Sequence, residues 1–381
     1  MRIAIIATNM IRIHSGAGKG TEIFVHLFTT ELARYVRKHN LPIEITLFAA
    51  GDSEVDIPVT SIRPVASSED PDVSPSLYKL YELSLVSEAF RRSDDFDLFH
   101  VHISNGEYVL PIARLVNKPI LITMHGGDDD AYHPDYFSQY KKDRKIHFVS
   151  ISESQKNRLP NVRHEKIIYH GIDVDDTFTF NLEGGGEIMW AGRAVPDKGL
   201  DIVMDVIQKV KKPVRIFPLI KPETINWLNE DVLKKRSRIA KYSKIKIDIN
   251  LSRYELVRQY QTSKLFLFPT EWEEPFGLVI AESMACGTPV VAFARGSVPE
   301  IVRDGTCGFI INPSDTDIRG DFIIKKTGLN GLVEAVERIY AMDQSEYLAL
   351  RRSTREHAQS RFQVKRMVRE YVELYNELVK R

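Results

Sequence analysis

Short apolar runs alternate with helical patterns along the whole chain, and this alternation restricts the fold more than any other feature. In the first half the strand-like runs are residues 2–7, 43–48, 98–102, 119–124, 146–151 and 166–169. In the second half they are residues 187–191, 213–217, 244–249, 265–269, 290–293 and 308–311. Strands that alternate with helices predict βαβ units and parallel sheets. A chain of 381 residues with this pattern is expected to form two α/β domains.

Composition excludes several classes of protein. The formal net charge is +0 with 27% charged residues, so the overall charge does not favour binding to nucleic acid. Cys286 and Cys307 are too few for a disulfide framework, which points to a reducing compartment and a cytoplasmic location. Residues 2–7 are predicted to form a first strand rather than a signal peptide, and no apolar run reaches the roughly 18 residues that span a bilayer.

One segment of the second half carries the most specific pattern. The apolar strand 265–269 leads into a turn, and Pro275 then stands where the first position of a helix tolerates a missing N–H. The helix is predicted to end near Cys286, because Gly287 suits the position after a helix and Pro289 cannot continue it. The order is therefore strand, turn, helix and the next buried strand.

Two acids on this predicted helix suggest a bound ligand. Glu274 lies just before the helix and Glu282 about two turns along it, so roughly 12 Å of rise separates them. This separation exceeds the roughly 5–9.5 Å of a glycosidase carboxylate pair. Acids so placed suit opposite ends of an elongated ligand, with a phosphate between them held by the amides of Phe276, Gly277 and Leu278. The alternative is that Glu274 caps the helix and Glu282 is solvated.

Two cations in another strand-to-helix turn point to the same chemistry. Arg193 and Lys198 are five residues apart in the turn after strand 187–191. An arginine fork and a lysine point charge together suit two phosphate groups and the negative charge that grows on them during departure. Pairing of both cations with nearby surface acids is the alternative.

The loop after the first strand is rich in glycine, with Gly16, Gly18 and Gly20 ahead of a predicted helix at 21–39. It is not a Walker A loop, because Ile13 occupies the first glycine position, and its spacing does not match a dinucleotide fingerprint. What remains is a flexible backbone near a helix N-terminus. It is either a loop that closes over a ligand or a plain turn.

Three histidines lie at or just after strands of the first half. His100 and His102 point to the same face of strand 98–102, but no third metal ligand has a recognisable spacing. Packing or contact with an acceptor substrate is therefore the favoured interpretation of this pair. His125 follows strand 119–124, and ligands of open α/β sheets bind beyond the carboxyl ends of strands. His125 is thus a candidate site residue, with a ligand-free turn histidine as the alternative.

These motifs together resemble those of the family 4 (group 1) glycosyltransferases, retaining enzymes of the GT-B fold that use nucleotide sugars. The resemblance is strongest at Glu274–Glu282, which matches the Glu-x7-Glu signature, and at the following Met284–Pro289. His170, where the family often has asparagine, and Gly296-Ser297, where many members have two glycines, are departures. The other motifs occur in family order, namely the glycine loop, His125 with two glycines, residues 170–173, the Arg193–Lys198 turn and residues 295–302.

The resemblance implies two Rossmann-like, doubly wound parallel-sheet domains that face a cleft. The first would be an acceptor-binding domain of residues 1–178, joined by a C-terminal helix at about 363–381 that crosses back to it. The second would be a nucleotide-sugar-binding domain of residues 187–360. Residues 174–186, which end in three glycines, are the predicted linker.

The resemblance also implies roles for individual residues. Arg193 and Lys198 would neutralise the diphosphate in place of a metal, so neither a metal nor another cofactor is expected. Glu282 would bind the ribose hydroxyls, Glu274 the hydroxyls of the transferred sugar, and His125 would lie near the reacting carbon. The implied catalytic residues are His125, Glu274, Arg193 and Lys198, and the implied donor-binding residues are Gly16, Gly18, Arg193, Lys198, Glu274, Phe276, Gly277, Leu278, Val279 and Glu282.

One acidic cluster could argue for a metal instead. Asp128, Asp129 and Asp130 contain an Asp-x-Asp pattern, which holds a divalent cation on the sugar diphosphate in the other major glycosyltransferase fold. Here the pattern follows the wrong strand, in a chain that already offers cations for the diphosphate. We therefore interpret it as a solvated loop.

The implied activity is transfer of a hexose, with retention, from a UDP-sugar such as UDP-glucose or from GDP-mannose. The acceptor is a sugar, a lipid-linked molecule or another small molecule, and both a monomer and a homodimer fit. A GT-B epimerase or hydrolase, or a non-catalytic nucleotide-sugar-binding partner subunit, is the alternative. The basic run 234–246 could contact an anionic membrane surface, although a solvated surface is the favoured interpretation.

Overall fold

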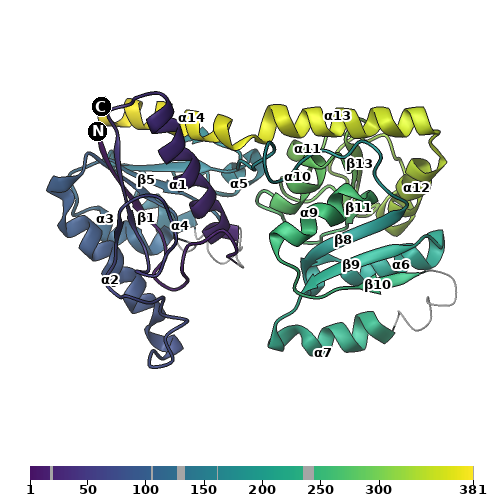
Figure 1. Ribbon diagram of the computed structural model, residues 1–381, viewed down its shortest axis with the longest axis horizontal. Coiled ribbons are helices and arrows are strands. Elements are labelled where there is room, and N and C mark those ends of the chain that lie inside the picture. The colour runs from purple at the N-terminus through teal and green to yellow at the C-terminus, as the bar shows by residue number, and fades with distance from the viewer. Residues whose placement is uncertain (18–19, 104–105, 127–133, 161, 235–243, 381) are drawn as a thin grey trace. The chain divides into compact units, whose positions relative to one another are not determined.

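The chain forms two compact units. The computed structural model describes residues 1–17, 20–103, 106–126, 134–160, 162–234 and 244–380. Unit 1 comprises Met1–Gly171 and Val364–Arg381, and unit 2 comprises Ile172–Gln363. Each unit contains one sheet with helices packed on it (Figure 1).

The sheet of unit 1 is parallel throughout, as the alternating sequence pattern predicts. Its strand order is β3-β2-β1-β4-β5-β6-β7. The two-residue strand β3 was not predicted, because so short a segment carries no hydrophobic period. The bounds are β1 Arg2–Ile6, β2 Glu44–Phe48, β3 Val59–Thr60, β4 Leu98–Val101, β5 Ile120–Thr123, β6 Ile146–Ser150 and β7 His164–Ile167.

Both faces of this sheet are buried, which explains its continuous apolar strands. On β1, Ile3 and Ile5 face one core with α1 and α14, whereas Ala4 and Ile6 face the other with α2. Helix α14 thus belongs to unit 1, and the prediction that the C-terminal helix crosses back is confirmed (Figure 1). The helices and 3-10 turns are α1 Gly20–Lys38, η1 Pro75–Leu77, α2 Tyr78–Arg91, η2 Ser93–Asp95, η3 Gly106–Val109, α3 Leu110–Ala113, α4 Pro134–Ser138, α5 Glu153–Arg158 and α14 Val364–Lys380.

Unit 2 repeats the same topology. Its parallel sheet has the order β10-β9-β8-β11-β12-β13, and α6 and α12 cover one of its faces. The strands are β8 Glu187–Arg193, β9 Val214–Leu219, β10 Ile245–Ile247, β11 Ser263–Phe268, β12 Val290–Phe293 and β13 Gly308–Ile311. The helical elements are η5 Pro196–Lys198, α6 Leu200–Val210, η6 Pro222–Thr224, α7 Ile225–Trp227, η7 Leu228–Leu233, α9 Arg253–Gln261, α10 Leu278–Ala285, α11 Val298–Ile301, α12 Gly328–Ala341 and α13 Gln344–Phe362.

In both sheets the chain leaves the first strand in one direction and later returns to its other side. In unit 1 this change of direction lies between β1 and β4, and in unit 2 between β8 and β11. Ligands of open α/β sheets bind at such a switch point, beyond the carboxyl ends of the strands. The fold therefore directs attention to the loops after β1, β4, β8 and β11.

Residues 174–186 are not a free linker, contrary to the sequence-based prediction. Arg355 donates to the carbonyls of Val174 and Phe178 at 2.8 Å, so the segment is fixed to unit 2. Two of its glycines, Gly184 and Gly185, serve close packing rather than flexibility. A Cβ on Gly185 would stand 1.9 Å from the carbonyl oxygen of Thr262. Of the helices that the structure describes, none is long and apolar enough to cross a membrane.

Candidate functional site

The turn after β8 carries the two predicted phosphate-binding cations. Arg193 is the exposed last residue of β8, and Lys198 is the buried last residue of η5. Gly199 follows with φ +69°, and a Cβ there would stand 2.1 Å from the carbonyl oxygen of Pro269. The indole N–H of Trp190 donates to the carbonyl of Lys198 at 3.2 Å. The close packing of Gly199 and the hydrogen bond from Trp190 thus fix the backbone that carries Lys198.

The loop after β11 binds directly to this turn. The carbonyl of Asp197 accepts hydrogen bonds from the backbone N–H of Glu271 and the hydroxyl of Thr270, both at 2.9 Å. Strands β8 and β11 are neighbours on the two sides of the switch point. The two motifs that the sequence predicted to share a ligand therefore meet at the carboxyl ends of adjacent strands.

Lys198 and Glu274 form the centre of this meeting point. Lys198 Nζ lies 2.7 Å from Glu274 Oε2, and their side chains are only 10% and 14% exposed. The rings of Phe268 and Trp272 lie 5.9 and 5.6 Å from the same ammonium group. An ion pair so enclosed is stronger than one in bulk water. It presents a cation suited to an anionic group beside a carboxylate that can accept hydroxyl protons in hydrogen bonds.

The loop after β12 holds Glu274 in place. Gly296 has φ +54°, and a Cβ there would stand 2.3 Å from the carbonyl oxygen of Glu274. The backbone N–H of Ser297 donates to that same carbonyl at 2.8 Å, and the Ser297 hydroxyl donates to the carbonyl of Phe276 at 2.9 Å. The Gly296-Ser297 departure from the family pattern therefore has a structural role here. Sequence reasoning missed it because the contact joins two distant loops.

The helix after Glu274 begins later than predicted. Helix α10 starts at Leu278, with Gly277 before it at φ +82°, so Pro275 is not at the first helical position. Pro275 was expected to begin the helix, but Gly277 adopts a left-handed conformation that interrupts the helical backbone before Leu278. The C-terminal prediction is confirmed, because Cys286 caps α10 and Gly287 follows at φ +82°. The amides at 276–279 therefore straddle the start of α10 instead of forming one helical turn.

Glu282 is buried on α10, so the alternative of a solvated residue is wrong. Its Oε1 lies 2.6 Å from Nε of Arg253, and the Tyr260 hydroxyl is 3.5 Å from Oε2. Burial raises the pKa of Glu282, and the positive charge of Arg253 opposes that shift. Arg253 also lies 4.7 Å from the ring centroid of Phe178. Sequence reasoning missed Arg253, whose one local signal is its place after the Ser252 cap of α9.

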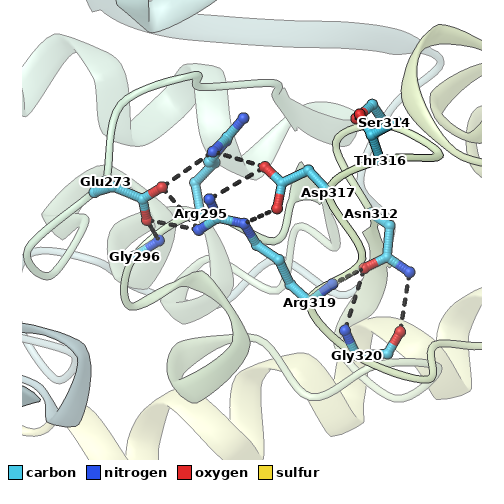
Figure 2. Close-up of polar contacts among 9 residues, drawn as sticks. All are labelled: Glu273, Arg295, Gly296, Asn312, Ser314, Thr316, Asp317, Arg319 and Gly320. Atoms are coloured by element: carbon cyan, nitrogen blue, oxygen red, sulfur yellow. Dashed lines mark hydrogen bonds and ion pairs between the residues drawn. The ribbon is translucent and has the colours of Figure 1, made fainter.

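A second set of charges surrounds Glu273, the residue before Glu274. Figure 2 shows Arg295 and Arg319 on its carboxylate, with Nη1 of each at 3.1 and 2.7 Å from Oε1. Asp317 bridges the same two arginines at 3.0 and 2.8 Å. These ion pairs also hold the loop after β11 in place, because Glu273 belongs to that loop. A cavity of about 310 Å³ beside it contains none of the predicted donor-site residues, and its lining includes Ile202, Asp205, Glu271, Arg295, Ser314 and Leu329.

In unit 1 the predicted histidines meet one another. His102 Nδ1 lies 3.0 Å from His125 Nε2, and His102 Nε2 lies 3.1 Å from His100 Nδ1. The prediction that His100 and His102 share a face is confirmed. His170 stacks on His125 with ring centroids 5.2 Å apart, so this departure from the family pattern also belongs to the cluster. Burial lowers the pKa of His125 to about 3, and the ring is neutral at physiological pH.

Of the remaining predicted residues, the structure describes Gly16 but not several of the others. Gly16 is an exposed residue of the loop between β1 and α1, and its backbone N–H donates to His14 Nδ1 at 3.2 Å. Gly18, Asp128, Asp129, Asp130 and most of the basic run 234–246 lie outside the described residues. Within the described ranges, no group of three or more His, Cys, Asp or Glu side chains is arranged to hold a metal ion.

Comparisons with known proteins agree on one family. Residues 178–320 match the model described as glycosyl transferases group 1, and residues 20–176 match glycosyltransferase family 4. An uncharacterized glycosyltransferase of Methanocaldococcus jannaschii is 27% identical over 68% of this chain and 77% of its own length. The D-inositol 3-phosphate glycosyltransferase of Mycolicibacterium smegmatis is 24% identical over 94% of this chain and 87% of its own length.

Solved structures show the same fold. Anabaena Alr3699/HepE, in complex with UDP and glucose, superposes with a TM-score of 0.72 at 18% identity, over 99% of this chain and 100% of that one. Sucrose-phosphate synthase from Thermosynechococcus elongatus gives a TM-score of 0.74 at 18% identity, over 99% of this chain and 98% of that one. Two Rossmann-like units of the GT-B type are therefore the fold of this chain.

Proposed function

This chain belongs to the group 1 glycosyltransferases of the GT-B fold, and we propose that it transfers a hexose from a nucleotide diphosphate sugar with retention of anomeric configuration. The observation that carries the proposal is the enclosed Lys198–Glu274 pair at the switch point of unit 2. A UDP-sugar such as UDP-glucose is the first candidate donor, and GDP-mannose the second. Anabaena Alr3699/HepE, a relative in fold, has been solved with UDP-glucose.

Lys198 and Arg193 bind the diphosphate of the donor in this proposal. When the donor enters, Lys198 Nζ shares its charge between Glu274 and a phosphate oxygen, while the exposed Arg193 approaches from the end of β8. The two cations stabilise the charge that develops on the leaving group. They take the place that a metal holds in other glycosyltransferases, so the proposed reaction needs no cofactor.

The carboxylates orient the two ends of the donor. Glu274 accepts hydrogen bonds from hydroxyls of the transferred sugar, and the amides at 276–279 add donors to phosphate and sugar. Glu282 accepts from the ribose through Oε2, because its contact with the Tyr260 hydroxyl is long at 3.5 Å. Arg253 holds the other oxygen and so fixes the carboxylate. Gly16, in the loop after β1, contacts the substrates in this proposal.

The chemical step joins the acceptor to the anomeric carbon on the face from which the phosphate leaves. The acceptor oxygen forms the new bond to that carbon, the bond between the carbon and the phosphate oxygen breaks, and the acceptor's proton passes to the departing phosphate. His125 contacts the sugar near the reacting carbon. The acceptor is a sugar, a lipid-linked molecule or another small molecule.

A two-part experiment tests this proposal. A panel of nucleotide sugars is first screened by thermal shift, because a ligand that binds the folded state raises the melting temperature. The stabilising donor is then incubated with candidate acceptors, and the anomeric configuration of the product is read by NMR. Release of nucleotide without an acceptor, or isomerised donor, would indicate the hydrolase or epimerase instead. Donor binding without turnover on any acceptor would indicate a non-catalytic partner.

Substitution of Lys198 tests whether the enclosed Lys198–Glu274 pair takes part in the reaction. Lys198→Ala is expected to lower kcat by about 10²–10³, the usual effect of removing one preorganised charge-stabilising group. Lys209→Ala, an exposed lysine on the following helix α6, is the matched control and should be neutral. Near-normal turnover in Lys198→Ala would remove the proposed role, and loss of wild-type turnover in EDTA would contradict metal independence.

A further inference from the structure

We propose that Phe178 is a positioning residue for the carboxylate of Glu282. Its ring holds the guanidinium of Arg253, and Arg253 in turn holds the carboxylate. The contact between Phe178 and Arg253 stands without any assignment of function. That the carboxylate held in this way receives the ribose of a nucleotide rests on the proposed function.

Phe178 is a buried aromatic residue in a largely exposed segment. Residues 174–186, all within the described ranges, form neither helix nor strand. The side chain of Phe178 is fully buried, whereas Asp175, Asp176 and Thr179 around it are exposed. A buried aromatic ring contributes a large contact area and a flat face of negative potential. The guanidinium of Arg253 lies against this ring, with Cζ 4.7 Å from the centroid.

The backbone of Phe178 is fixed to the helix that carries Glu282. Its N–H donates to the carbonyl of Asp173 at 2.9 Å, and its carbonyl accepts from Nη1 of Arg355 at 2.8 Å. The same Nη1 donates to the carbonyl of Ala285, the last residue of α10, at 2.7 Å. Arg355 therefore ties Phe178 directly to the carboxyl end of α10.

A second contact ties the same segment to α9, the helix that begins with Arg253. The side-chain amide of Gln261, the last residue of α9, donates to the carbonyl and the hydroxyl oxygen of Thr179, each at 2.9 Å. Helices α9 and α10 also pack against each other. The ring of Phe178 consequently has a fixed place relative to Arg253 on one helix and Glu282 on the other.

Hydrogen bonds alone do not fix the side chain of Arg253. Its Nε lies 2.6 Å from Glu282 Oε1, and within the described ranges its buried Nη2 has no hydrogen-bond partner. A single hydrogen bond through Nε does not by itself set the orientation of the guanidinium plane. The ring of Phe178 supplies the second contact, because a guanidinium over an aromatic face is attracted to the π electrons. The Arg253 side chain is only 13% exposed, which strengthens this attraction.

Glu282 depends on the orientation of Arg253 because its other contact is weak. Arg253 binds Oε1, whereas Oε2 lies 3.5 Å from the hydroxyl of Tyr260. An arginine that is held in one orientation keeps the carboxylate in one orientation, and an arginine that turns lets the carboxylate turn with it. In the proposed function Oε2 accepts from the ribose. Phe178 then determines how well the site distinguishes a ribose from a sugar that lacks its hydroxyls.

A double-mutant cycle in urea tests the contact itself. Phe178→Leu, Arg253→Met and the double variant are made in the full-length protein, and unfolding is followed by tryptophan fluorescence. The loss of the partner of Glu282 is common to both Arg253→Met proteins, so it cancels from the cycle. Phe178→Leu is expected to change the unfolding equilibrium constant about fivefold more in the wild-type background than in the Arg253→Met background, the scale of one enclosed cation–π contact. Equal changes in the two backgrounds would overturn the proposal.

Phe178→Met is measured in the same cycle, so that one poorly folded variant does not decide the result. Methionine fills a similar space with a flexible side chain but offers no aromatic face. It should therefore give the same coupling to Arg253 as Phe178→Leu. A coupling that disappears with methionine would show that packing volume, and not the ring face, holds the arginine.

Binding of nucleoside diphosphates tests the step from Arg253 to the ribose. Calorimetry compares UDP with 2′,3′-dideoxy-UDP, or the two corresponding guanine nucleotides if thermal shift selects a guanine donor. The wild type should prefer the ribose form by about tenfold or more, the strength of a hydrogen bond to a charged group. Phe178→Leu should reduce this preference about three- to fivefold, and should not reduce it further in the Arg253→Met background. Phe180→Leu, on the same segment but 37% exposed, is the matched control and should leave the preference unchanged.

The outcomes separate this inference from the proposed function. An unchanged ribose preference in Phe178→Leu, or an equal loss in Phe180→Leu, would overturn the positioning role. Weaker binding of both nucleotides by the same factor would also overturn it, because the ring would then support the site as a whole and not the direction of Glu282. If the wild type binds no nucleoside diphosphate, the proposed function and the ribose step fail together, while the cycle in urea still decides whether Phe178 holds Arg253.

Discussion

The two units share one topology but differ in the polar groups that they bury near the carboxyl ends of their central strands. Unit 1 buries neutral imidazoles and hydroxyls in a chain that contains no ion pair, from His125 to Tyr375. Unit 2 buries charges, as Lys198 with Glu274 and as Arg253 with Glu282. The sequence composition follows the same division, because His357 is the one of 11 histidines that belongs to unit 2.

The difference teaches what each sheet edge is suited to bind. A cation held in a protein crevice attracts an anionic ligand, and its carboxylate partner balances its charge. A chain of neutral imidazoles attracts no ion, but each ring offers one hydrogen-bond donor and one acceptor. In the proposed function, the charges of unit 2 therefore suit the diphosphate of the donor, and the neutral histidines of unit 1 suit uncharged hydroxyls such as those of the transferred sugar.

Acid should separate the two units, and this is the largest effect we expect. Burial lowers the pKa of His125 to about 3, and the pKa values of His100, His102 and His170 fall in the same direction. Between about pH 6.5 and 3 the unfolded chain binds protons that folded His125 does not, so the free energy of unfolding falls as pH is lowered. His125 alone accounts for about 2 kcal/mol at pH 5.

Glu282 has the opposite sign. Its raised pKa means that the folded state holds a proton more tightly than the unfolded chain, so acidification through that window does not destabilise unit 2. The single histidine of unit 2, His357, has a lowered pKa from burial and adds a smaller effect of the first sign. Unit 1 should therefore unfold at a higher pH than unit 2.

Intrinsic fluorescence can follow the two units separately. The three tryptophans, Trp190, Trp227 and Trp272, all lie in unit 2. On acid titration, far-UV circular dichroism should lose part of its signal before tryptophan emission shifts. Coincident transitions of the two signals would remove the electrostatic distinction between the units.

The next largest effect concerns the pair Glu282 and Arg253. Glu282→Gln leaves the Arg253 guanidinium partly buried without a counter-charge, and breaking a buried pair in this way costs about 3–5 kcal/mol. Urea unfolding followed by tryptophan fluorescence measures the loss in unit 2. Adding Arg253→Met should recover part of it, because the unpaired charge is then absent. A loss below about 1 kcal/mol for Glu282→Gln would mean that solvent reaches the pair.

These contacts also mark the limit of what the sequence could predict. Most strands follow from hydrophobic periodicity and the two ligand-binding motifs from residue spacing, which are local. That both motifs serve one ligand was implied by the resemblance to the family. Two contacts depend instead on segments that are distant in the sequence and meet in space. They are the ion pair of Glu282 with Arg253 and the close packing of Gly296 against the carbonyl of Glu274. The helix start was misplaced for the same reason, since Gly277 takes a positive φ that no neighbouring residue signals.

Gly296 should show a smaller effect of a different kind. Gly296→Ala places a Cβ 2.3 Å from the Glu274 carbonyl oxygen at φ +54°, and relieving that contact should cost about 1–3 kcal/mol and displace Glu274. Gly186→Ala is the matched control, because nothing lies within 4 Å of its added Cβ. Urea unfolding and kcat are measured for both variants. Gly186→Ala should be neutral, and a neutral Gly296→Ala would show that the loop after β12 does not hold Glu274.

The smallest loss of stability is expected from the ion pairs around Glu273, although they are at least as many as the buried pairs. Asp317 bridges Arg295 and Arg319, but its side chain is 32% exposed, and solvent screens such pairs to about 0–1 kcal/mol. Asp317→Asn should therefore lower the free energy of unfolding by less than about 1 kcal/mol, and less still in high salt. Both arginines keep Glu273 as a partner, so neither is left uncompensated.

The contrast between Asp317 and Glu282 isolates burial as the cause, because both carboxylates contact arginine within one unit. Measured side by side in urea at 0.1 and 1 M salt, only the Asp317→Asn loss should shrink as the Debye length falls from about 10 to 3 Å. If Asp317→Asn cost as much as Glu282→Gln, ion pairing itself rather than enclosure would stabilise unit 2. The comparison with the uncharged chain of unit 1 would then rest on the presence of charge and not on its burial.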